Sequence, residues 1–267
     1  MTICIAAICE SGRKVVVASD RMITAGFLSL EFEHPSSKID TLANSTVGLT
    51  AGDALANTEL FRACRGMVSQ FQAPSVEMIA THVKEQFVRL RQQKAEERHL
   101  APRGLTFQGF YQEGLINRIP PDLAVHIDSE IQRGVFPLEI IIAGVDSAGA
   151  HIYGVTDPGV SECYDRLGFH AIGSGETHAL LTIIGGEHAP ERAINDTVFL
   201  VYEAKRKAEL AQGVGNATEL GIISEDGLYV VTEAQKQELR QVYDQKMSPQ
   251  LEHVKKAVSG LPFTGAK

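Results

Sequence analysis

Strand patterns and pairs of helix patterns alternate in blocks along this chain, and this order is the feature that most constrains its fold. The apolar segments 2–9 and 14–19 flank a short turn and predict a β-hairpin. Helical spacing of apolar residues follows over 53–71, where Asp53 can cap the first turn, and again from Pro74. Further strands are predicted at 38–42, 45–51, 138–145, 151–155, 169–172, 218–224 and 228–232, and further helices at 176–184, 189–212 and 233–247.

Hairpins dominate the β portions, so the sheets are expected to be mainly antiparallel. Two such sheets with helices on their outer faces satisfy this pattern, as an α+β fold of the four-layer αββα sandwich type, although the pattern alone makes this one of several options. One domain is predicted over 1–247, with 233–247 as an additional C-terminal helix and 248–267 as a loose tail. Residues 97–136 contain several prolines and glycines without a firm period, which indicates an insertion or elaborated loop.

Composition excludes several functional classes. The net charge of -8 argues against nucleic acid or an anionic membrane as the main partner. No apolar run approaches the roughly 20 residues of a membrane span, and no secretion signal is recognisable, so we expect a cytoplasmic protein. The four cysteines form no CxxC pair and the histidines no HxH or HExxH spacing, so neither a metal nor another cofactor is predicted.

Several short motifs occur in a distinctive order. Thr2-Ile-Cys-Ile-Ala opens the chain, and Val16-Val-Ala-Ser-Asp20 precedes Thr24-Ala-Gly26. Together with later segments they resemble the proteasome β-subunit family of N-terminal-nucleophile hydrolases, in its bacterial proteasome-like type. The resemblance covers about 2–71 and 138–232. Its later segments are Ser37-Lys38-Ile39, Thr50-Ala-Gly52-Asp53, Ile141-Ile-Ala-Gly144-Val-Asp146 and Ile172-Gly-Ser-Gly175.

The resemblance implies that Thr2 is the nucleophile once Met1 has been removed. A threonine hydroxyl needs a base, and a free α-amino group has a pKa of roughly 7.7 to 8, close to neutral. Thr2 would then carry both nucleophile and base. Without the downstream motifs, Thr2 is only the second residue of an ordinary strand.

The resemblance assigns roles to four further residues. Lys38 would stabilise the developing alkoxide, with Asp20 as its buried partner. Gly52 would donate its backbone N–H to the oxyanion, and Ser174 would orient or shuttle a proton beside the amine. Without the family pattern, Lys38 is a surface lysine after a polar loop, and Ser174 lies in a tight turn before a helix.

The chain departs from the family at one place. The family has an aspartate followed three residues later by serine and glycine, and the best match here is Glu209-Leu-Ala-Gln212-Gly213. Glu209 keeps the charge with one more methylene. We expect Glu209 to position the amine, with catalytic efficiency in question because shifts of about 1 Å can cost about a hundredfold in rate.

The sequence thus predicts a threonine-type amide hydrolase, in the first place a peptidase, that forms a homo-oligomeric ring. Two alternatives stay open. One is a related hydrolase that cleaves a small amide, with 97–136 either capping the pocket or forming an oligomer contact. The other is a structural relative whose site has decayed. The departures at Glu209 and Gln212 favour it slightly, and the residues that match the family, Thr2, Asp20, Lys38 and Ser174, argue against it.

Overall fold

The computed structural model describes residues 2–25, 30–35, 37–111 and 119–259. The chain divides into two compact units, 1–229 and 230–267. The predicted single domain ended at 247 instead. Helix α7 (Glu233–Ser259) belongs to the second unit and continues through the first part of the predicted tail, where Leu251, Val254 and Val258 keep helical spacing. Residues 260–267 lie outside the described residues.

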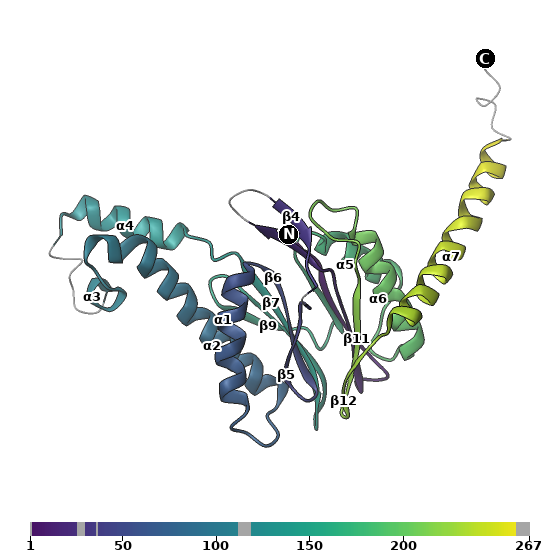
Figure 1. Cartoon of the computed structure of the whole chain (residues 1–267), viewed down its shortest axis with the longest axis horizontal. Helices are drawn as coiled ribbons and strands as arrows, with labels where there is room; N and C mark the ends of the chain where they lie inside the picture. The colour runs from purple at the N-terminus through teal and green to yellow at the C-terminus, as the bar shows by residue number, and fades with distance from the viewer. Residues whose placement is uncertain (1, 26–29, 36, 112–118, 260–267) are drawn as a thin grey trace, which may run out of the picture. The chain divides into compact units, whose positions relative to one another are not determined.

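The first unit contains two five-stranded sheets with antiparallel pairing (Figure 1). The predicted hairpin is confirmed, since β1 and β2 pair with Cys4 opposite Ser19. The first sheet has the order β10-β1-β2-β11-β12, and the second has the order β5-β6-β7-β8-β9. Their bounds are β1 (Cys4–Cys9), β2 (Lys14–Ser19), β5 (Ile39–Ala43), β6 (Thr46–Gly52), β7 (Leu138–Asp146), β8 (Gly149–Thr156), β9 (Val160–Cys163), β10 (Phe169–Ile172), β11 (Glu219–Ser224) and β12 (Gly227–Val230).

A small additional sheet was not predicted from the sequence. It consists of β3 (Met22–Ala25) and β4 (Leu30–Glu33), which pair antiparallel with Met22 opposite Glu33. These strands are only four residues long and follow Asp20 directly, so no run of alternating apolar residues indicated them.

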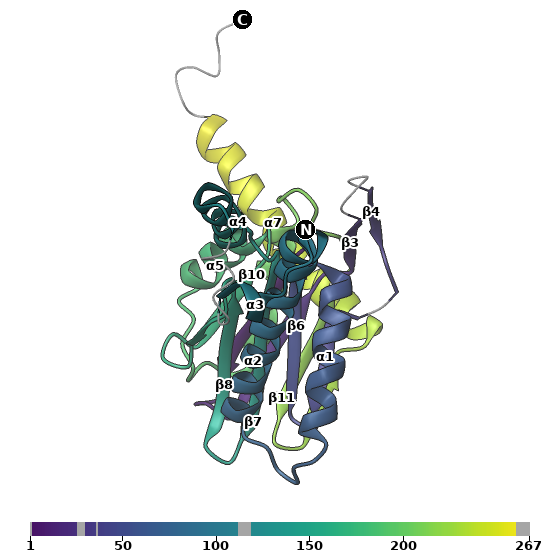
Figure 2. The same cartoon turned by 90° about the vertical axis from the view of Figure 1, so that its left-hand side faces the viewer.

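Four helices cover the two large sheets. They are α1 (Ala54–Val68), α2 (Val76–Ala95), α5 (Glu176–Gly185) and α6 (Ile194–Ala208). Asp53 caps α1, as predicted, and accepts hydrogen bonds from Leu55 N at 2.9 Å and Ala56 N at 3.2 Å. Figures 1 and 2 show α1 and α2 against the sheet that contains β6 and β7, and Figure 1 shows α5 and α6 beside the sheet that contains β11.

The two large sheets pack face to face through an apolar core. Inward-facing residues of β1 and β2, such as Ala6 and Val17, meet residues of β6 and β7, such as Leu49 and Ile141. A second cluster joins the other face of β7 to α1 and α2, with Phe61 and Phe87 fully buried. The strands that carry the predicted site residues are therefore held on both faces.

The described part of 97–136 is mostly helical, which corrects the prediction of an elaborated loop. It contains the π-helical turn η1 (Glu96–Leu100), η2 (Ala101–Arg103), α3 (Phe107–Tyr111) and α4 (Pro121–Arg133). The prolines misled the prediction because Pro102 and Pro121 stand at helix starts, where the missing N–H costs little. This segment has its own buried cluster of Leu100, Phe110, Ile127 and Ile131.

Among the described residues, none of the helices is both long enough and apolar enough to cross a membrane.

Candidate active site

Thr2 and Asp20 lie together at the open end of the β1–β2 hairpin. Thr2 precedes β1 and Asp20 follows β2, so the antiparallel register brings them side by side. The Thr2 hydroxyl donates a short hydrogen bond to Asp20 Oδ1, and the backbone N–H of Ile3 donates to the same oxygen at 3.2 Å. Both side chains are shielded from solvent, since Thr2 is 3% exposed and Asp20 is 0% exposed.

Lys38 completes this cluster from the second sheet. It directly precedes β5, and its Nζ donates to Asp20 Oδ1 at 2.7 Å and to Thr2 Oγ1 through a short contact. The Lys38 side chain is 13% exposed. A hydroxyl oxygen therefore lies between a carboxylate and an ammonium group in a largely desolvated place, where charge–charge interactions are stronger than in water.

The second carboxylate oxygen of Asp20 is held by backbone groups. Gly215 N donates to Oδ2 at 2.8 Å and Met22 N donates at 3.2 Å. A buried carboxylate is stable only when its lone pairs are satisfied. These bonds fix the orientation of Asp20 and so the oxygen that it presents to Thr2.

Glu219 holds the segment that carries Lys38, and sequence reasoning missed it. Its Oε2 accepts from Lys38 N at 2.9 Å, Ser37 Oγ at 2.9 Å and Ser19 Oγ at 3.1 Å. Its Oε1 accepts from Arg21 Nε at 3.0 Å. Glu219 begins β11 and is 7% exposed. An acidic residue at the start of a buried strand was the one signal that could have indicated it.

Gly52 lies at the end of β6 and lines a cavity of about 430 Å³ together with Thr2. Its φ of 111° suits glycine alone, and Asp53 N donates to the Pro137 carbonyl beside it at 2.9 Å. Ser174 lines the same cavity. Thr2, Gly52 and Ser174 thus line one cavity.

Ser174 contacts the backbone of Thr2. Its hydroxyl lies 3.4 Å from Thr2 O and 3.1 Å from Gln212 O, and Gly175 N donates to Thr2 O at 3.3 Å. A serine hydroxyl has one proton, so it donates to one of the two carbonyls at a time. The turn packs so tightly against Thr2 that it has no room for a side chain at Gly173, since a Cβ there would lie 2.4 Å from Thr2 O.

Glu209 does not take the position predicted for it. It follows the last residue of α6, and its Oε1 accepts from Lys205 Nζ at 2.7 Å while Oε2 lies 3.5 Å from Arg206. The carboxylate therefore pairs with its own helix and not with the backbone of Thr2. The extra methylene of glutamate over aspartate suits this contact, since residues four apart on a helix face each other.

Lys205 and Glu139 are two more residues that the sequence did not single out. Lys205 is fully buried in α6, and its spacing of four from Glu209 was the available signal. Glu139 lines the Thr2 cavity and accepts from Gly173 N at 2.9 Å. It thereby holds the turn that carries Ser174.

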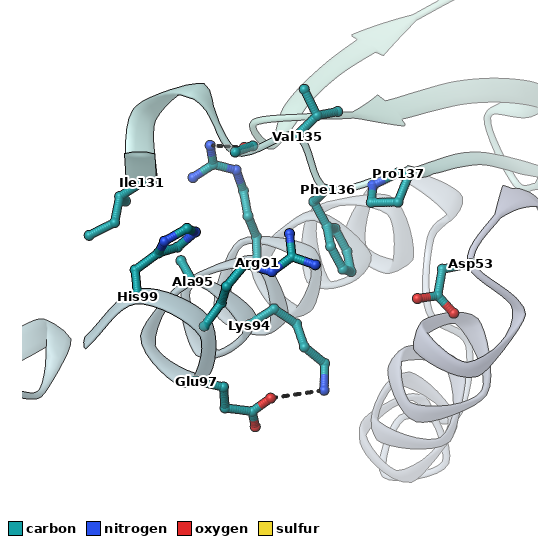
Figure 3. A pocket seen from close by; sticks show the side chains of 12 residues that line it. Asp53, Arg91, Lys94, Ala95, Glu97, His99, Ile131, Val135, Phe136 and Pro137 are labelled. Carbon is teal, nitrogen blue, oxygen red and sulfur yellow. Dashed lines mark hydrogen bonds and ion pairs between the residues drawn. The ribbon is translucent and has the colours of Figure 1, made fainter. Parts of the chain in front are cut away.

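Figure 3 shows a second cavity of about 430 Å³, and the lining residues Val135, Phe136 and Pro137 are common to it and the first cavity. Two of the cations that line the second cavity are paired with acids. Arg91 contacts Asp157 at 2.8 Å, and Lys94 contacts Glu97 at 3.2 Å. The 135–137 segment, which ends the predicted insertion, is thus the common wall of the two cavities.

No group of three or more histidine, cysteine or acidic side chains in the described part of the chain is arranged to hold a metal ion. Compared with known proteins, the chain matches no protein-family model and no curated protein sequence.

Proposed function

We propose that this protein is a threonine-type amide hydrolase of the proteasome β-subunit type, acting as a peptidase, with the four-layer αββα sandwich of that family. The observation that carries the proposal is the position of Thr2 Oγ1 between Asp20 and Lys38 at a cavity that Gly52 also lines. A hydroxyl beside an ammonium group is a site where an alkoxide is stabilised as it forms.

In the proposed reaction, Thr2 becomes the N-terminal residue and its free amine takes the hydroxyl proton. Lys38 stabilises the oxygen that attacks, and Asp20 balances the charge of Lys38. The N–H of Gly52 stabilises the oxyanion of the tetrahedral intermediate. Ser174, within 3.4 Å of the Thr2 carbonyl, keeps the terminal residue in place and relays a proton near the amine.

A small amide is the second candidate substrate. The cavity of about 430 Å³ falls within the range of small-molecule pockets and also fits the side chain and flanking groups of a peptide residue. Residues 135–137 form one wall of this cavity, and a wall on this side favours a small amide over a longer peptide. Hydrolysis of short fluorogenic peptides, compared with single amino-acid amides, separates the two candidates.

We also propose a homo-oligomeric ring in the cytoplasm, which rests on the family resemblance alone. Light scattering after gel filtration measures the mass of the assembly. A monomer at micromolar concentration would contradict this part of the proposal and would leave the chemistry of Thr2 untouched.

The chemistry is tested first by intact mass and then by a peptide epoxyketone, which reacts with an N-terminal threonine. We expect a chain that begins at Thr2 and one adduct per active site. Thr2→Ala abolishes the adduct, whereas Thr41→Ala, an exposed threonine of β5, keeps it. A chain purified from cells with Met1 in place, or an adduct on Thr2→Ala, would overturn the proposal.

A further inference from the structure

Lys205 is a buried cation whose three donor protons are all used. Its side chain is 0% exposed, and Nζ donates to Glu209 Oε1 at 2.7 Å, Gly215 O at 2.8 Å and Asn216 O at 3.0 Å. Burial lowers the pKa of Lys205, and the Glu209 carboxylate acts against this change. Burying a lysine is costly, so a role limited to packing would be served better by an apolar residue.

Gly215 joins Lys205 to the candidate site. Its carbonyl accepts from Lys205 Nζ, and its N–H donates to Asp20 Oδ2 at 2.8 Å. A Cβ on Gly215 would lie 3.0 Å from Glu33 Oε1 and 3.2 Å from Met22, so the backbone comes close to its neighbours on this side as well. The backbone of this one residue is therefore held by Lys205 on its carbonyl side and holds Asp20 Oδ2 on its N–H side.

We propose that Lys205 is a positioning residue for Asp20: it clamps the carbonyls of Gly215 and Asn216 so that the Gly215 N–H holds Oδ2 and leaves Oδ1 to Thr2 and Lys38. This inference rests on the proposed function of Thr2. Lys205 reaches the reacting hydroxyl through two intermediates, Gly215 and Asp20, and does not line the cavity.

The same arrangement gives Glu209 a different role from the one expected. Glu209 is the counter-ion of Lys205, and its second oxygen lies near Arg206 at 3.5 Å. Gln212, the other departure from the family pattern, contributes its backbone carbonyl to Ser174 at 3.1 Å, which any side chain at this position permits. Both departures are thus compatible with an intact site.

The test uses the full chain and the peptide epoxyketone, with adduct formation followed by intact mass. Lys205→Met alone leaves Glu209 partly uncompensated and risks misfolding. The informative variant is therefore Lys205→Met combined with Glu209→Gln, which removes both charges. Lys207→Met combined with Glu203→Gln is the matched control, because it likewise removes both charges of an ion pair on the same helix.

We expect the double variant to react about 10- to 100-fold more slowly at saturating epoxyketone, since Asp20 and Thr2 lose their alignment. The concentration for half-saturation stays within about twofold of wild type, because the cavity lining is unchanged. Exchange of the Gly215 amide proton with solvent becomes faster. The control, Lys207→Met combined with Glu203→Gln, changes none of these quantities.

The outcomes separate the role of Lys205 from the proposed function of Thr2. A folded double variant that reacts at the wild-type rate, with Gly215 still protected, overturns the role of Lys205 and leaves the proposed function intact. A double variant that loses affinity and rate equally is also evidence against positioning. Wild-type protein that forms no adduct at Thr2 overturns the proposed function, and this inference falls with it.

Discussion

Gly52 meets Pro137 so closely that a Cβ on Gly52 would lie 2.0 Å from the Pro137 carbonyl oxygen. The contact is between two backbones, and the φ of Gly52 is 111°, a conformation that other residues avoid. The residue proposed to donate to the oxyanion is thus also the place where β6 turns against the wall of the cavity.

Gly52→Ala is expected to destabilise the protein by about 3 kcal/mol or more, since both the clash and the φ oppose it. It should also abolish the epoxyketone adduct. The matched control is Gly66→Ala in α1, where a Cβ meets nothing within 4 Å, and we expect a gain of about 0.5 to 1 kcal/mol there. Urea unfolding measures both. A Gly52→Ala protein as stable as wild type would contradict the geometry.

Glu219→Gln tests the support of the lysine segment. The change weakens hydrogen bonds to Lys38 N, Ser37 and Arg21 that the negative charge now strengthens. We expect a loss of about 2 kcal/mol in unfolding free energy and slower adduct formation, because Lys38 is held less firmly. Glu225→Gln, in the exposed turn between β11 and β12, is the control. Unchanged stability and rate would show that Glu219 is dispensable.

His170 makes stability fall in acid. Burial lowers the pKa of His170 to about 4 from an ordinary value of 6.5, and its ring stacks on Tyr164 at 3.8 Å between centroids. The folded state therefore favours neutral His170. Its contribution, about 3 kcal/mol, is present above pH 6.5 and is lost as the pH falls through about 4.

His170→Phe should remove this part of the pH dependence, because phenylalanine keeps the stack and does not titrate. Urea unfolding at pH 7, 5.5 and 4.5 measures how the unfolding free energy of wild type and of His170→Phe depends on pH. The exposed His126→Gln is the control. Parallel curves for wild type and His170→Phe would contradict the prediction.

Cys163 is the thiol of the native chain that we expect to react first with a disulfide reagent. It is exposed on β9, whereas Cys4, Cys9 and Cys64 are buried. Burial raises the pKa of Cys9 to about 11 and that of Cys64 to about 12, which keeps them protonated and slow. Titration should find about one thiol in native protein, none in Cys163→Ser, and all four of wild type in denaturant. Rapid reaction of a second native thiol would count against this burial.

Local patterns predicted the parts of the fold that depend on neighbours in sequence. The β1–β2 hairpin follows from two apolar runs around a turn, and the start of α1 follows from Asp53 as a cap. The 97–136 segment was misjudged because the prolines that begin helices look the same in sequence as those that interrupt them.

The supporting residues of the site could not be predicted in this way. Glu219 contacts Lys38 from 181 positions away, and Gly215 contacts Asp20 from 195 positions away. Such contacts exist only once β11 lies beside β2. The pairing of Glu209 could not be predicted for the same reason: its partner Lys205 is buried by tertiary packing, and only then does Lys205 need a counter-ion.

The register of the β1–β2 hairpin has one more consequence. Cys4 pairs with Ser19 because four residues, 10–13, connect the strands at the end of the hairpin opposite Thr2. One inserted residue in that turn, unless absorbed as a bulge, would shift the pairing and turn the side chains of one strand to the other face. The length of a connection far from both residues therefore determines whether Thr2 lies beside Asp20. A change in that length would separate them without altering any residue of the site.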